Sequence, residues 1–285
     1  MELSVVIVSY RSHEPLLECL AALEADAHGI EHEIVVVDND PVGGDLLAIG
    51  RDHPGVRGIA NAENVGYARA INQGIAATTG AFVLAMNPDC RLERGALAAL
   101  MGHLRTHPKT AVVGPMIRDS DGTLQYSARA FPDHLTFLFN RYSLLTRLFP
   151  ANRFSRRYLL SDWDHASVRD VDWLSGACLM VRRDAIREVG GMDEAFFMFN
   201  EDVDWCRRMK TAGWAVTYVP GARCVHHVGA SRKKVASRVI LERHRGMIHY
   251  FHKHHPTHPV VTFCADALIL MRAGVMLTAN ALRPR

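Results

Sequence analysis

Residues 3–40, LSVVIVSYRSHEPLLECLAALEADAHGIEHEIVVVDND, decide the fold class of this chain. Leu3 to Val8 and Glu33 to Val37 are short apolar, β-branched runs bounded by polar residues, a pattern typical of buried strands. Residues 14–25 between them carry Leu and Ala at helical spacing. Strand, helix and strand in this order predict a parallel sheet that is covered by helices.

The same alternation continues outward to residue 117. Phe82 to Met86 repeats the strand pattern most clearly. The other elements expected in this half are strands at Val56 to Ile59 and Ala111 to Ile117, and helices at 67–78 and 94–107. The pattern predicts an α/β fold with a mostly parallel central sheet flanked by helices, in which ligands bind at the carboxyl ends of the strands.

Bulk composition limits the function classes. With 285 residues and 48% hydrophobic content, the chain can form one large domain, or a domain with an appendage. A formal net charge of +3 is too balanced for a nucleic-acid-binding protein, so no nucleic acid partner is expected. The six cysteines form no C-x-x-C pair, and the chain opens into a strand pattern without a basic leader, so we expect a cytoplasmic protein.

The pattern changes after a turn signal at residues 119–122. Asp133 to Phe149 is apolar almost all round and is accompanied by arginines, so it predicts a helix that lies in a membrane interface or packs on its own domain. The α/β pattern then resumes with strands at Gly176 to Val181 and Trp214 to Val219, and helices at Asp184 to Val189 and Asp202 to Ala212.

The C-terminal part reads as a helical extension. A basic, His-rich helix follows Val235, and residues 260–282 form an apolar segment just long enough to span a bilayer. Asp266 and Arg272 oppose spanning, because each charge costs roughly 2.5 to 3.5 kcal/mol at a helix centre. They share one broad side with the other polar residues, which suits a helix lying on a membrane surface; packing on the body, or on a second copy in a homodimer, is the alternative.

Three polar clusters directly follow expected strands: Ser9-Tyr10, Asp38-Asn39-Asp40 and Asn87-Pro88-Asp89. Because the carboxyl ends of parallel strands meet at one edge of a sheet, we expect these clusters to face one crevice. Asp38 suits a hydrogen bond from the N3 amide of a pyrimidine base, although a strand-end Asp more often caps a turn.

The turn before the helix at 67–78 holds a second group of candidates. Asn64, Val65 and Gly66 precede helical amides that can face a diphosphate, and Arg69 one turn later can supply positive charge. An exposed helical arginine that makes surface ion pairs is the alternative interpretation of Arg69.

Asp89 and His226 are the candidates for a metal site. Pro88 fixes the backbone before the Asp89 carboxylate, an oxygen ligand that a hard cation needs. His226, in a polar turn after a strand, adds an imidazole suited to Mn²⁺ or another transition metal. A hydrogen-bonded surface histidine is the alternative, and only one of His226 and His227 is expected to bind directly.

Glu201 and Asp202 lie at the expected helix start. Asn200 suits a helix cap, and acids favour the first turn, with a stabilisation of about 0.5 to 2 kcal/mol. Capping does not account for the aromatic run at residues 196–199 beside the acids. Such an apolar wall raises the pKa of a carboxylate, as a general base requires.

Together these segments resemble the inverting, GT-A-fold glycosyltransferases of the large family-two group, in particular the bacterial rhamnosyltransferase-like branch. The resemblance covers residues 3–231 in order, through SVVIVSY, EIVVVDND, NAENVGYARAINQG, LAMNPD, WLSGACLMVRR, GGMDEAFFMFNEDVDWCRR, GW and HHVGAS. It implies a Rossmann-like GT-A domain at 1–231, with a nucleotide-binding half at 1–117 and an acceptor-binding half at 118–231. A C-terminal helical extension at 232–285 follows.

The resemblance also implies roles for single residues. Those that look like base and ribose contacts are Ser9, Tyr10, Asp38 and Asn39, and those that look like diphosphate contacts are Asn64, Gly66 and Arg69. Asp89 matches the metal-binding acid of the D-x-D position, with Asn87 in place of the first acid, and His226 matches the additional metal ligand. Those that look like acceptor or sugar contacts are Trp173, Gly176 and Glu201, and Asp202 matches the catalytic base.

The implied reaction moves a sugar, rhamnose in the favoured case, from a dTDP or UDP sugar with inversion, assisted by Mg²⁺ or Mn²⁺. The implied acceptor is a saccharide on a polyprenyl diphosphate, used for cell-surface polysaccharide and reached by a peripheral protein on the inner face of the cell membrane. Two other classes stay open. One is a non-catalytic sugar-nucleotide-binding or membrane-scaffold protein. The other is a sugar nucleotidyltransferase, which would require a Gly-rich loop directly after the first strand, where this chain has SYRSHEP.

Overall fold

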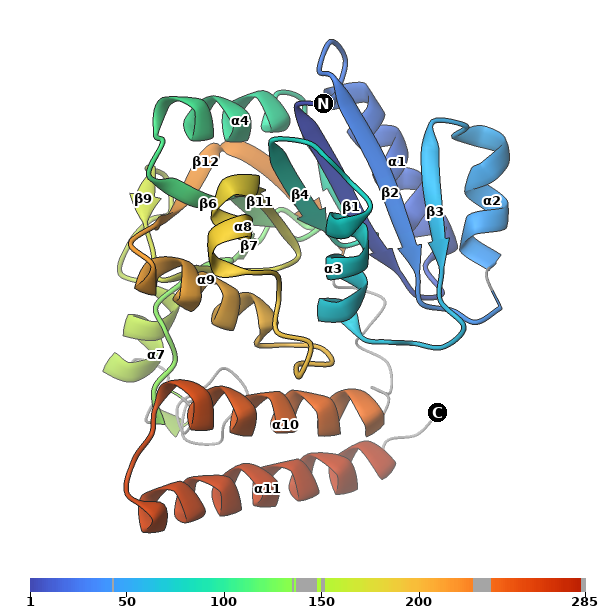
Figure 1. Ribbon diagram of the computed structural model, residues 1–285. Helices are drawn as coiled ribbons and strands as arrows, with labels where there is room; N and C mark the ends of the chain where they lie inside the picture. The colour runs from blue at the N-terminus through green and yellow to red at the C-terminus, as the bar shows by residue number, and fades with distance from the viewer. Residues whose placement is uncertain (43, 135, 137–147, 150–151, 228–236, 283–285) are drawn as a thin grey trace.

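Helices cover both faces of one large sheet in the computed structural model, which describes residues 1–285 apart from 43, 135, 137–147, 150–151, 228–236 and 283–285 (Figure 1). The first half alternates strands and helices as the sequence predicts. Its elements are β1 (Leu3–Ser9), α1 (His13–Asp26), β2 (His32–Asp38), α2 (Gly44–Asp52), β3 (Val56–Ala60), α3 (Tyr67–Ala76), β4 (Phe82–Met86), β5 (Cys90–Leu92), α4 (Ala96–Thr106) and β6 (Thr110–Arg118).

The second half adds shorter strands and ends in two long helices. Its elements are β7 (Leu124–Gln125), β8 (Ala128–Arg129), α7 (Arg153–Leu159), β9 (Arg169–Asp170), β10 (Trp173–Leu174), β11 (Cys178–Arg182), α8 (Arg183–Val189), α9 (Glu201–Thr211), β12 (Ala215–His226), α10 (Ser237–His254) and α11 (Pro259–Ala281). Most of the helix expected at 133–149 lies outside the described residues.

The main sheet has the strand order β3-β2-β1-β4-β11-β6-β12-β5. The strands β3, β2, β1, β4, β6 and β12 run in one direction, which confirms the predicted mostly parallel sheet. The sequence pattern did not reveal that β11 enters antiparallel between β4 and β6. This insertion brings the start of β11 next to the carboxyl end of β4, where Cys178 is in register with Met86.

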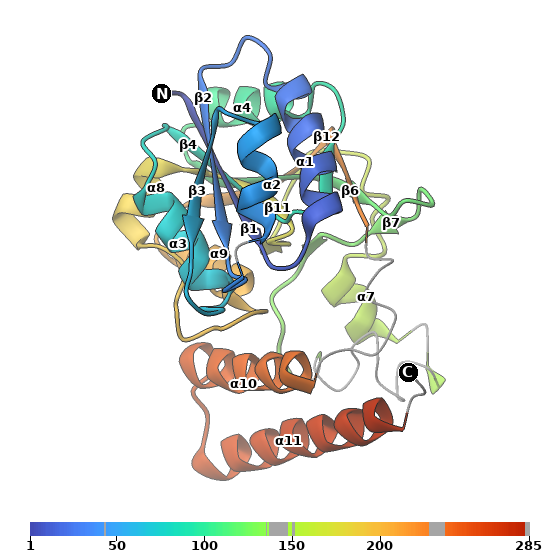
Figure 2. The same cartoon turned by 90° about the vertical axis from the view of Figure 1, so that its right-hand side faces the viewer.

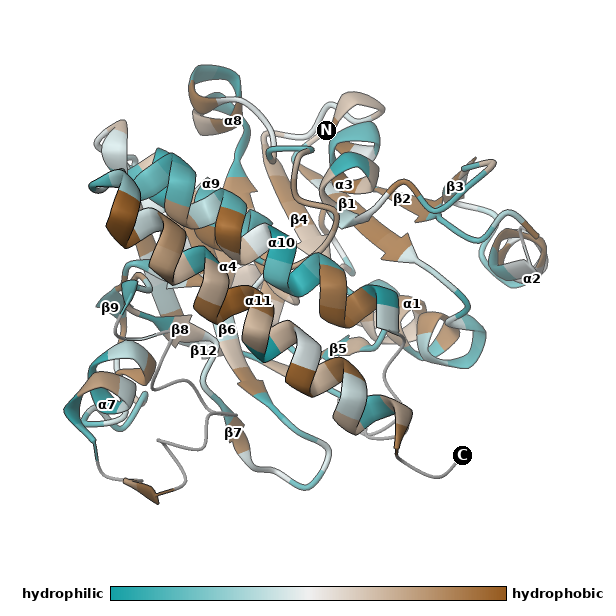
Figure 3. Cartoon of the chain, turned by 90° about the horizontal axis from the view of Figure 1, so that it is seen from below, coloured by the Kyte–Doolittle hydropathy of each residue, from teal (hydrophilic) through white to brown (hydrophobic). Residues whose placement is uncertain are grey.

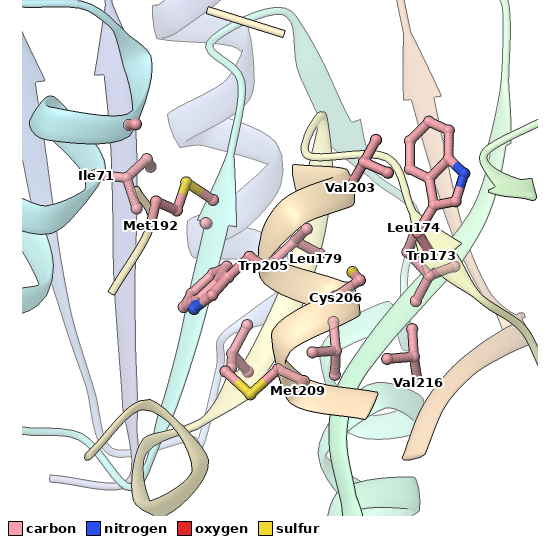
Figure 4. Close-up of a cluster of buried hydrophobic side chains, with 14 of the residues drawn as sticks. Ile71, Trp173, Leu174, Leu179, Met192, Val203, Trp205, Cys206, Met209 and Val216 are labelled. Carbon is pink, nitrogen blue, oxygen red and sulfur yellow. The ribbon is translucent and has the colours of Figure 1, made fainter. Parts of the chain in front are cut away.

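Both faces of the central strands are buried, as the continuous apolar runs require. Val6 and Val35 point to one side of the sheet, and Val5 and Val36 point to the other. The helices α3 and α9 cover the first side, where Trp205 is fully buried and donates its indole N–H to the Gly190 carbonyl at 2.9 Å (Figure 4). The helices α1 and α4 cover the second side with leucines. Burial of each such side chain contributes about 1.5 to 3 kcal/mol.

Several short elements, among them β5, β7 to β10 and α7, were not predicted, and two further differences concern the site and its surroundings. The strand expected at 214–219 continues to His226 as β12, with a register shift against β6 between Val219 and Arg223. His226 is therefore the last residue of a strand and not part of a following turn. The helix α2 was not predicted, because its sequence GDLLAIGRD contains two glycines and lacks a long apolar stripe.

The helices α10 and α11 lie side by side on the side of the sheet toward which β1, β2 and β3 point (Figures 1 and 2). This places the two C-terminal helices near the same strand ends that carry the polar clusters.

Candidate active site

The turn at Gly176 and Ala177, immediately before β11, joins the two halves of the site. The Gly176 amide donates to the Asp202 Oδ2 at 2.8 Å. The Ala177 carbonyl accepts from the Asn87 amide at 2.8 Å, two residues before Asp89. Residues more than 100 positions apart in the sequence therefore lie around one short turn. Gly176 also allows a close approach, because an added Cβ would lie 3.3 Å from the Asp202 Cβ and Asp202 would have to shift by a few tenths of an ångström.

Asp89 and His226 face each other at the edge of this region. The Asp89 Oδ1 lies 3.3 Å from the His226 Nε2, with the carboxylate side chain 33% exposed. The His226 Nδ1 lies 2.9 Å from the Oε1 of Gln125, an acceptor, so Nδ1 donates; Nε2 faces Asp89, with a lone pair for a cation in the neutral ring and an N–H for the carboxylate in the protonated ring. Burial lowers the pKa of His226, but the hydrogen bond and charge of Asp89 outweigh it, so the net shift is upward.

This pair fits a divalent cation. A carboxylate oxygen and an imidazole nitrogen are ligands that Mn²⁺ accepts, and the exposed side of Asp89 leaves room for diphosphate oxygens. Cys90 is also close enough to count as a ligand. However, its Sγ donates to the Ala177 carbonyl at 3.1 Å, and burial raises the pKa of the thiol well above its usual value. Cys90 therefore remains a thiol on the core side of the site. His227 turns away, with its ring against Arg91.

The acid pair at the start of α9 has strongly perturbed pKa values. Glu201 is 6% exposed, and burial and the Asp202 charge raise its pKa well above the usual value. Burial also raises the pKa of Asp202, but the amides of Gly176 and Val203 and the charge of Arg129 oppose that shift. Two neighbouring carboxylates do not both ionise readily, and the donors and positive charge around Asp202 favour its ionisation over that of Glu201.

The backbone before this pair is unusual. Phe199 and Asn200 have φ values of 69° and 70°, which non-glycine residues adopt at a cost of about 1 to 3 kcal/mol each, commonly near functional sites. The expected cap by Asn200 is wrong, because its side chain makes no capping hydrogen bond. Instead, Asp202 Oδ1 accepts from the Val203 amide at 2.9 Å. After this left-handed turn, Asp202 reaches Gly176, while the Glu201 Oε2 is buried without a hydrogen-bond partner among the described residues.

The donor-side candidates lie at the ends of β1 and β2, where Ser9 and Asp38 are in register. Both are fully buried, and the Asp38 Oδ2 has no hydrogen-bond partner among the described residues. Burial raises the pKa of Asp38, and the charges of Asp45 and Asp40 act in the same direction. The Ser9 hydroxyl donates to Asp45 Oδ2 at 2.5 Å. An acceptor atom held without a donor at this depth suits an N–H of a bound base.

The Asn64 to Gly66 turn is held from two directions. Asn64 Oδ1 accepts from the Gly66 amide at 3.0 Å, and the Gly66 carbonyl accepts from the Asn39 Nδ2 at 3.1 Å. The Tyr67 amide donates to the Phe197 carbonyl at 2.7 Å. Two of the amides expected to face a diphosphate are therefore already bonded, and Asn39 supports this turn. Arg69 is 58% exposed and lies 3.8 Å from Glu194.

The remaining predicted contacts divide into exposed and buried side chains. Tyr10 is 45% exposed at the end of β1, with the Arg11 guanidinium over its ring. Trp173 does not line the crevice as expected, because the side chain is 5% exposed and belongs to the core beside α9 (Figure 4). Its indole N–H donates to the Ala130 carbonyl at 2.8 Å, so the apolar ring supports the site from behind.

Sequence reasoning missed four residues that shape the site. Gln125 orients His226, and Asp45 holds Ser9. The Tyr67 hydroxyl donates to the Gly176 carbonyl at 2.8 Å, and Arg129 places a positive charge near Asp202. Tyr67 lies one residue after a recognised turn and was within reach of a sequence argument. The roles of the other three depend on contacts across the fold, which leave no local signal.

A mixed sheet with acids and a histidine gathered at its carboxyl edge defines a glycosyltransferase of the GT-A type. The family model described as glycosyltransferase like family 2 matches residues 2–247, and the chain belongs to this family. The chain is accordingly an inverting GT-A glycosyltransferase.

Individual relatives agree with this assignment. N-acetylglucosaminyl-diphospho-decaprenol L-rhamnosyltransferase from Mycobacterium tuberculosis is 33% identical over 254 residues, 85% of this chain and 81% of that relative. Rhamnosyltransferase WbbL from Escherichia coli is 24% identical over 245 residues, 82% of this chain and 86% of the relative. The structure of mannosyltransferase PcManGT from Pyrobaculum calidifontis with GDP-Man and Mn²⁺ aligns with a TM-score of 0.60 at 17% identity. That alignment covers 98% of this chain and 73% of that one, and it shows a shared fold.

Proposed function

We propose that this protein transfers a sugar, with rhamnose favoured, from a dTDP or UDP sugar to a saccharide linked to a polyprenyl diphosphate, in the synthesis of a cell-surface polysaccharide. The names of the two rhamnosyltransferase relatives support the sugar, and the decaprenol in the first name supports the acceptor. The single observation that carries the proposal is the position of Asp202. Its carboxylate is held by the Gly176 amide, one residue from the Ala177 carbonyl that binds the Asp89 segment.

Asp202 is the general base in this proposal. Its Oδ2 takes the proton of the acceptor hydroxyl while that oxygen forms a bond to the anomeric carbon. The bond from this carbon to the diphosphate oxygen breaks, and the nucleoside diphosphate leaves with the electron pair. The attack comes from the face opposite the leaving group, so the configuration inverts. Arg129 favours the ionised Asp202, and the buried Glu201 remains protonated and able to donate a hydrogen bond.

The donor lies across the carboxyl ends of β1, β2 and β4 in this proposal. The unpaired Asp38 Oδ2 accepts from the base. Asp89 and His226 would hold a divalent cation, Mn²⁺ or Mg²⁺, which when bound neutralises charge on the departing diphosphate. Arg69 can turn from Glu194 toward the same charge, because their ion pair is long and exposed. The six free cysteines support a cytoplasmic location.

The test is product analysis with purified protein. Radiolabelled dTDP-rhamnose or UDP sugars are mixed with an N-acetylglucosamine acceptor on a short polyprenyl diphosphate, with Mn²⁺ or Mg²⁺. We expect a labelled lipid-linked disaccharide and free nucleoside diphosphate. Asp202→Asn keeps the side-chain shape and should lower kcat by about 10²- to 10⁴-fold with nearly unchanged donor binding. Unchanged kcat in this variant would remove Asp202 as the base.

The same assay separates the two other classes. Release of pyrophosphate from a sugar phosphate and a nucleoside triphosphate would indicate a nucleotidyltransferase. Donor binding without any product, across the panel of donors and acceptors, would indicate a binding or scaffold protein.

A further inference from the structure

The helix α11 is apolar along most of its length, and its charged and amide side chains Asp266, Arg272 and Asn280 lie on its inner, partly buried side. The Asp266 Oδ2 lies 2.8 Å from the His252 Nε2 of α10, and Asn280 is 6% exposed. The opposite side is exposed and apolar, and hydrophobic residues recur along the α11 ribbon in the view from below (Figure 3). Its large side chains and their exposed fractions are Val260 63%, Val261 49%, Phe263 73%, Leu268 41%, Leu270 57%, Met271 62%, Val275 65% and Leu282 80%. A helix whose outer face met water would have the reverse arrangement.

The outer face is also wide and without charge. At 100° per residue, the exposed positions from 260 to 282 cover about half of the helix circumference. The two charged residues of α11, Asp266 and Arg272, both lie on the partly buried side. A protein partner usually presents a narrower apolar core surrounded by a polar rim. A bilayer covers a broad, uncharged face without such a rim, so the width favours lipid over a second copy of the chain.

Positive charge lies on α10, the helix that packs behind this face. The helix α10 packs along α11 and carries Arg238, Arg243, Arg245 and Lys253 against the single acid Glu242. Arg245 is 70% exposed. Packed helices are 8 to 10 Å apart, about the depth to which an interfacial helix sinks, so α10 would lie at the level of the headgroups. Of these basic residues, Arg238 and Arg245 are exposed and can meet anionic lipid, whereas Arg243 and Lys253 face the loop at residues 193–199.

The helix α10 also holds the loop that leads to the acid pair. The Arg238 and Arg243 guanidinium groups lie over the Phe197 and Phe199 rings at 4.3 and 4.2 Å. Lys253 Nζ lies 2.7 Å from Asp193 Oδ2 at the beginning of this loop. Contact with a bilayer through α11 would therefore orient the site directly, without an intervening flexible segment among these described residues.

We propose that α11 lies in the interface of an anionic bilayer, with the face of Phe263, Leu270, Met271 and Val275 in the acyl boundary and α10 at the headgroups. By length and composition α11 is also able to cross a membrane. Lying flat is favoured, because spanning would pull Asp266 and Arg272 away from α10 and into the hydrocarbon. The docking of α11 on a bilayer is inferred from the geometry alone. That docking presents the active site to a lipid-linked acceptor rests in addition on the proposed function.

The test measures binding to vesicles of phosphatidylglycerol and phosphatidylcholine by co-sedimentation. Phe263→Glu with Met271→Glu should weaken binding at least tenfold. The control, Leu47→Glu with Val168→Glu, adds the same charge at side chains that are 77% and 54% exposed elsewhere, and should bind as the unaltered protein does. Circular dichroism must show that all three proteins are folded. Equal binding by the α11 double variant would overturn the proposal.

A second measurement reads the position of the helix. Cys264 on α11 is exposed, and the other five cysteines are buried, so an environment-sensitive fluorophore labels it selectively. Its emission should shift to the blue on addition of vesicles, and alkaline carbonate should release the protein. If the protein stays bound to the vesicles in alkaline carbonate, α11 spans the membrane and does not lie in the interface. An unchanged emission, together with a lipid-free dimer that the α11 variant dissociates, would assign the face to a second copy.

Turnover separates this proposal from the proposed function. The α11 double variant should keep its kcat on a water-soluble short-chain acceptor and lose most of its rate on a long-chain acceptor in vesicles. If no protein transfers sugar but vesicle binding follows the pattern above, the proposed function fails and the docking surface stands.

Discussion

Replacing Gly66 by alanine is expected to lower both the free energy of unfolding and kcat, because the added Cβ would collide with the Phe197 carbonyl. Gly66 has φ 89° and ψ 168°, a region that is essentially restricted to glycine and costs another residue about 1 to 3 kcal/mol. A Cβ at this position would lie 2.5 Å from the Phe197 carbonyl oxygen, where real contacts are at least 3.0 Å. The carbonyl must retreat, and its 2.7 Å hydrogen bond from the Tyr67 amide is lost or stretched.

The expected loss follows from these two parts. Backbone strain contributes about 1 to 3 kcal/mol, and the Tyr67 hydrogen bond contributes about 0.5 to 1.5 kcal/mol, so the free energy of unfolding should fall by about 1.5 to 4.5 kcal/mol. Because Phe197 leads directly into Glu201 and Asp202, kcat should fall as well, beyond any change in donor affinity. Urea unfolding followed by tryptophan fluorescence measures the first effect, and steady-state kinetics measures the second.

Gly213→Ala is the matched control. Gly213 has the same φ of 89°, but an added Cβ would meet no atom within 4 Å, so this variant carries strain without the clash. We expect it to lose less stability than Gly66→Ala and to keep its kcat. If the two variants lose equal stability, or if Gly66→Ala keeps full kcat, the Phe197 contact is not the link between the turn and the acid pair.

The other predictions concern the metal pair and the docking of α10. Asp89→Ala should weaken donor binding in isothermal titration when Mn²⁺ is present and change it little when the metal is chelated; equal affinity under both conditions would speak against a metal site. Gln125→Ala should lower Mn²⁺ affinity by about 10- to 100-fold, because His226 loses both the acceptor at Nδ1 and the Gln125 Nε2–H that donates to its carbonyl; Gln125→Glu, which retains only the acceptor, should lose less. Asp204 is fully buried against Lys253 and His254, and hydrogen bonds outweigh burial so that its pKa is lowered in the folded state. Its contribution to stability is therefore complete above the unfolded pKa near 3.9 and is lost as the pH falls through the lower folded value. Urea unfolding between pH 3 and pH 7 should show this loss, and Asp204→Asn should flatten the curve.

The first half of the molecule was predictable because its signals are local. Val5 and Val6 point to opposite faces and are both buried, and this needs apolar residues at every position of the strand. The same runs end in polar residues, so Ser9, Asp38 and Asp89 could be placed at one edge of the sheet. Second roles left no signal in the sequence, as when the Asn39 Nδ2 donates to the Gly66 carbonyl.

The sequence by itself determined the chemical groups of this protein: apolar strands for the sheet, acids and a histidine at strand or helix ends, and an α11 segment with polar and apolar sides. The tertiary structure decided which of these groups meet. The antiparallel insertion of β11 carries Gly176 between Asp202 and the Asn87 segment, and α10 determines that the polar side of α11 turns inward. The hydrophobic pattern of the sequence predicts which side chains are buried. It does not predict which residues they contact, because strand order and helix docking depend on the sum of many contacts between distant residues.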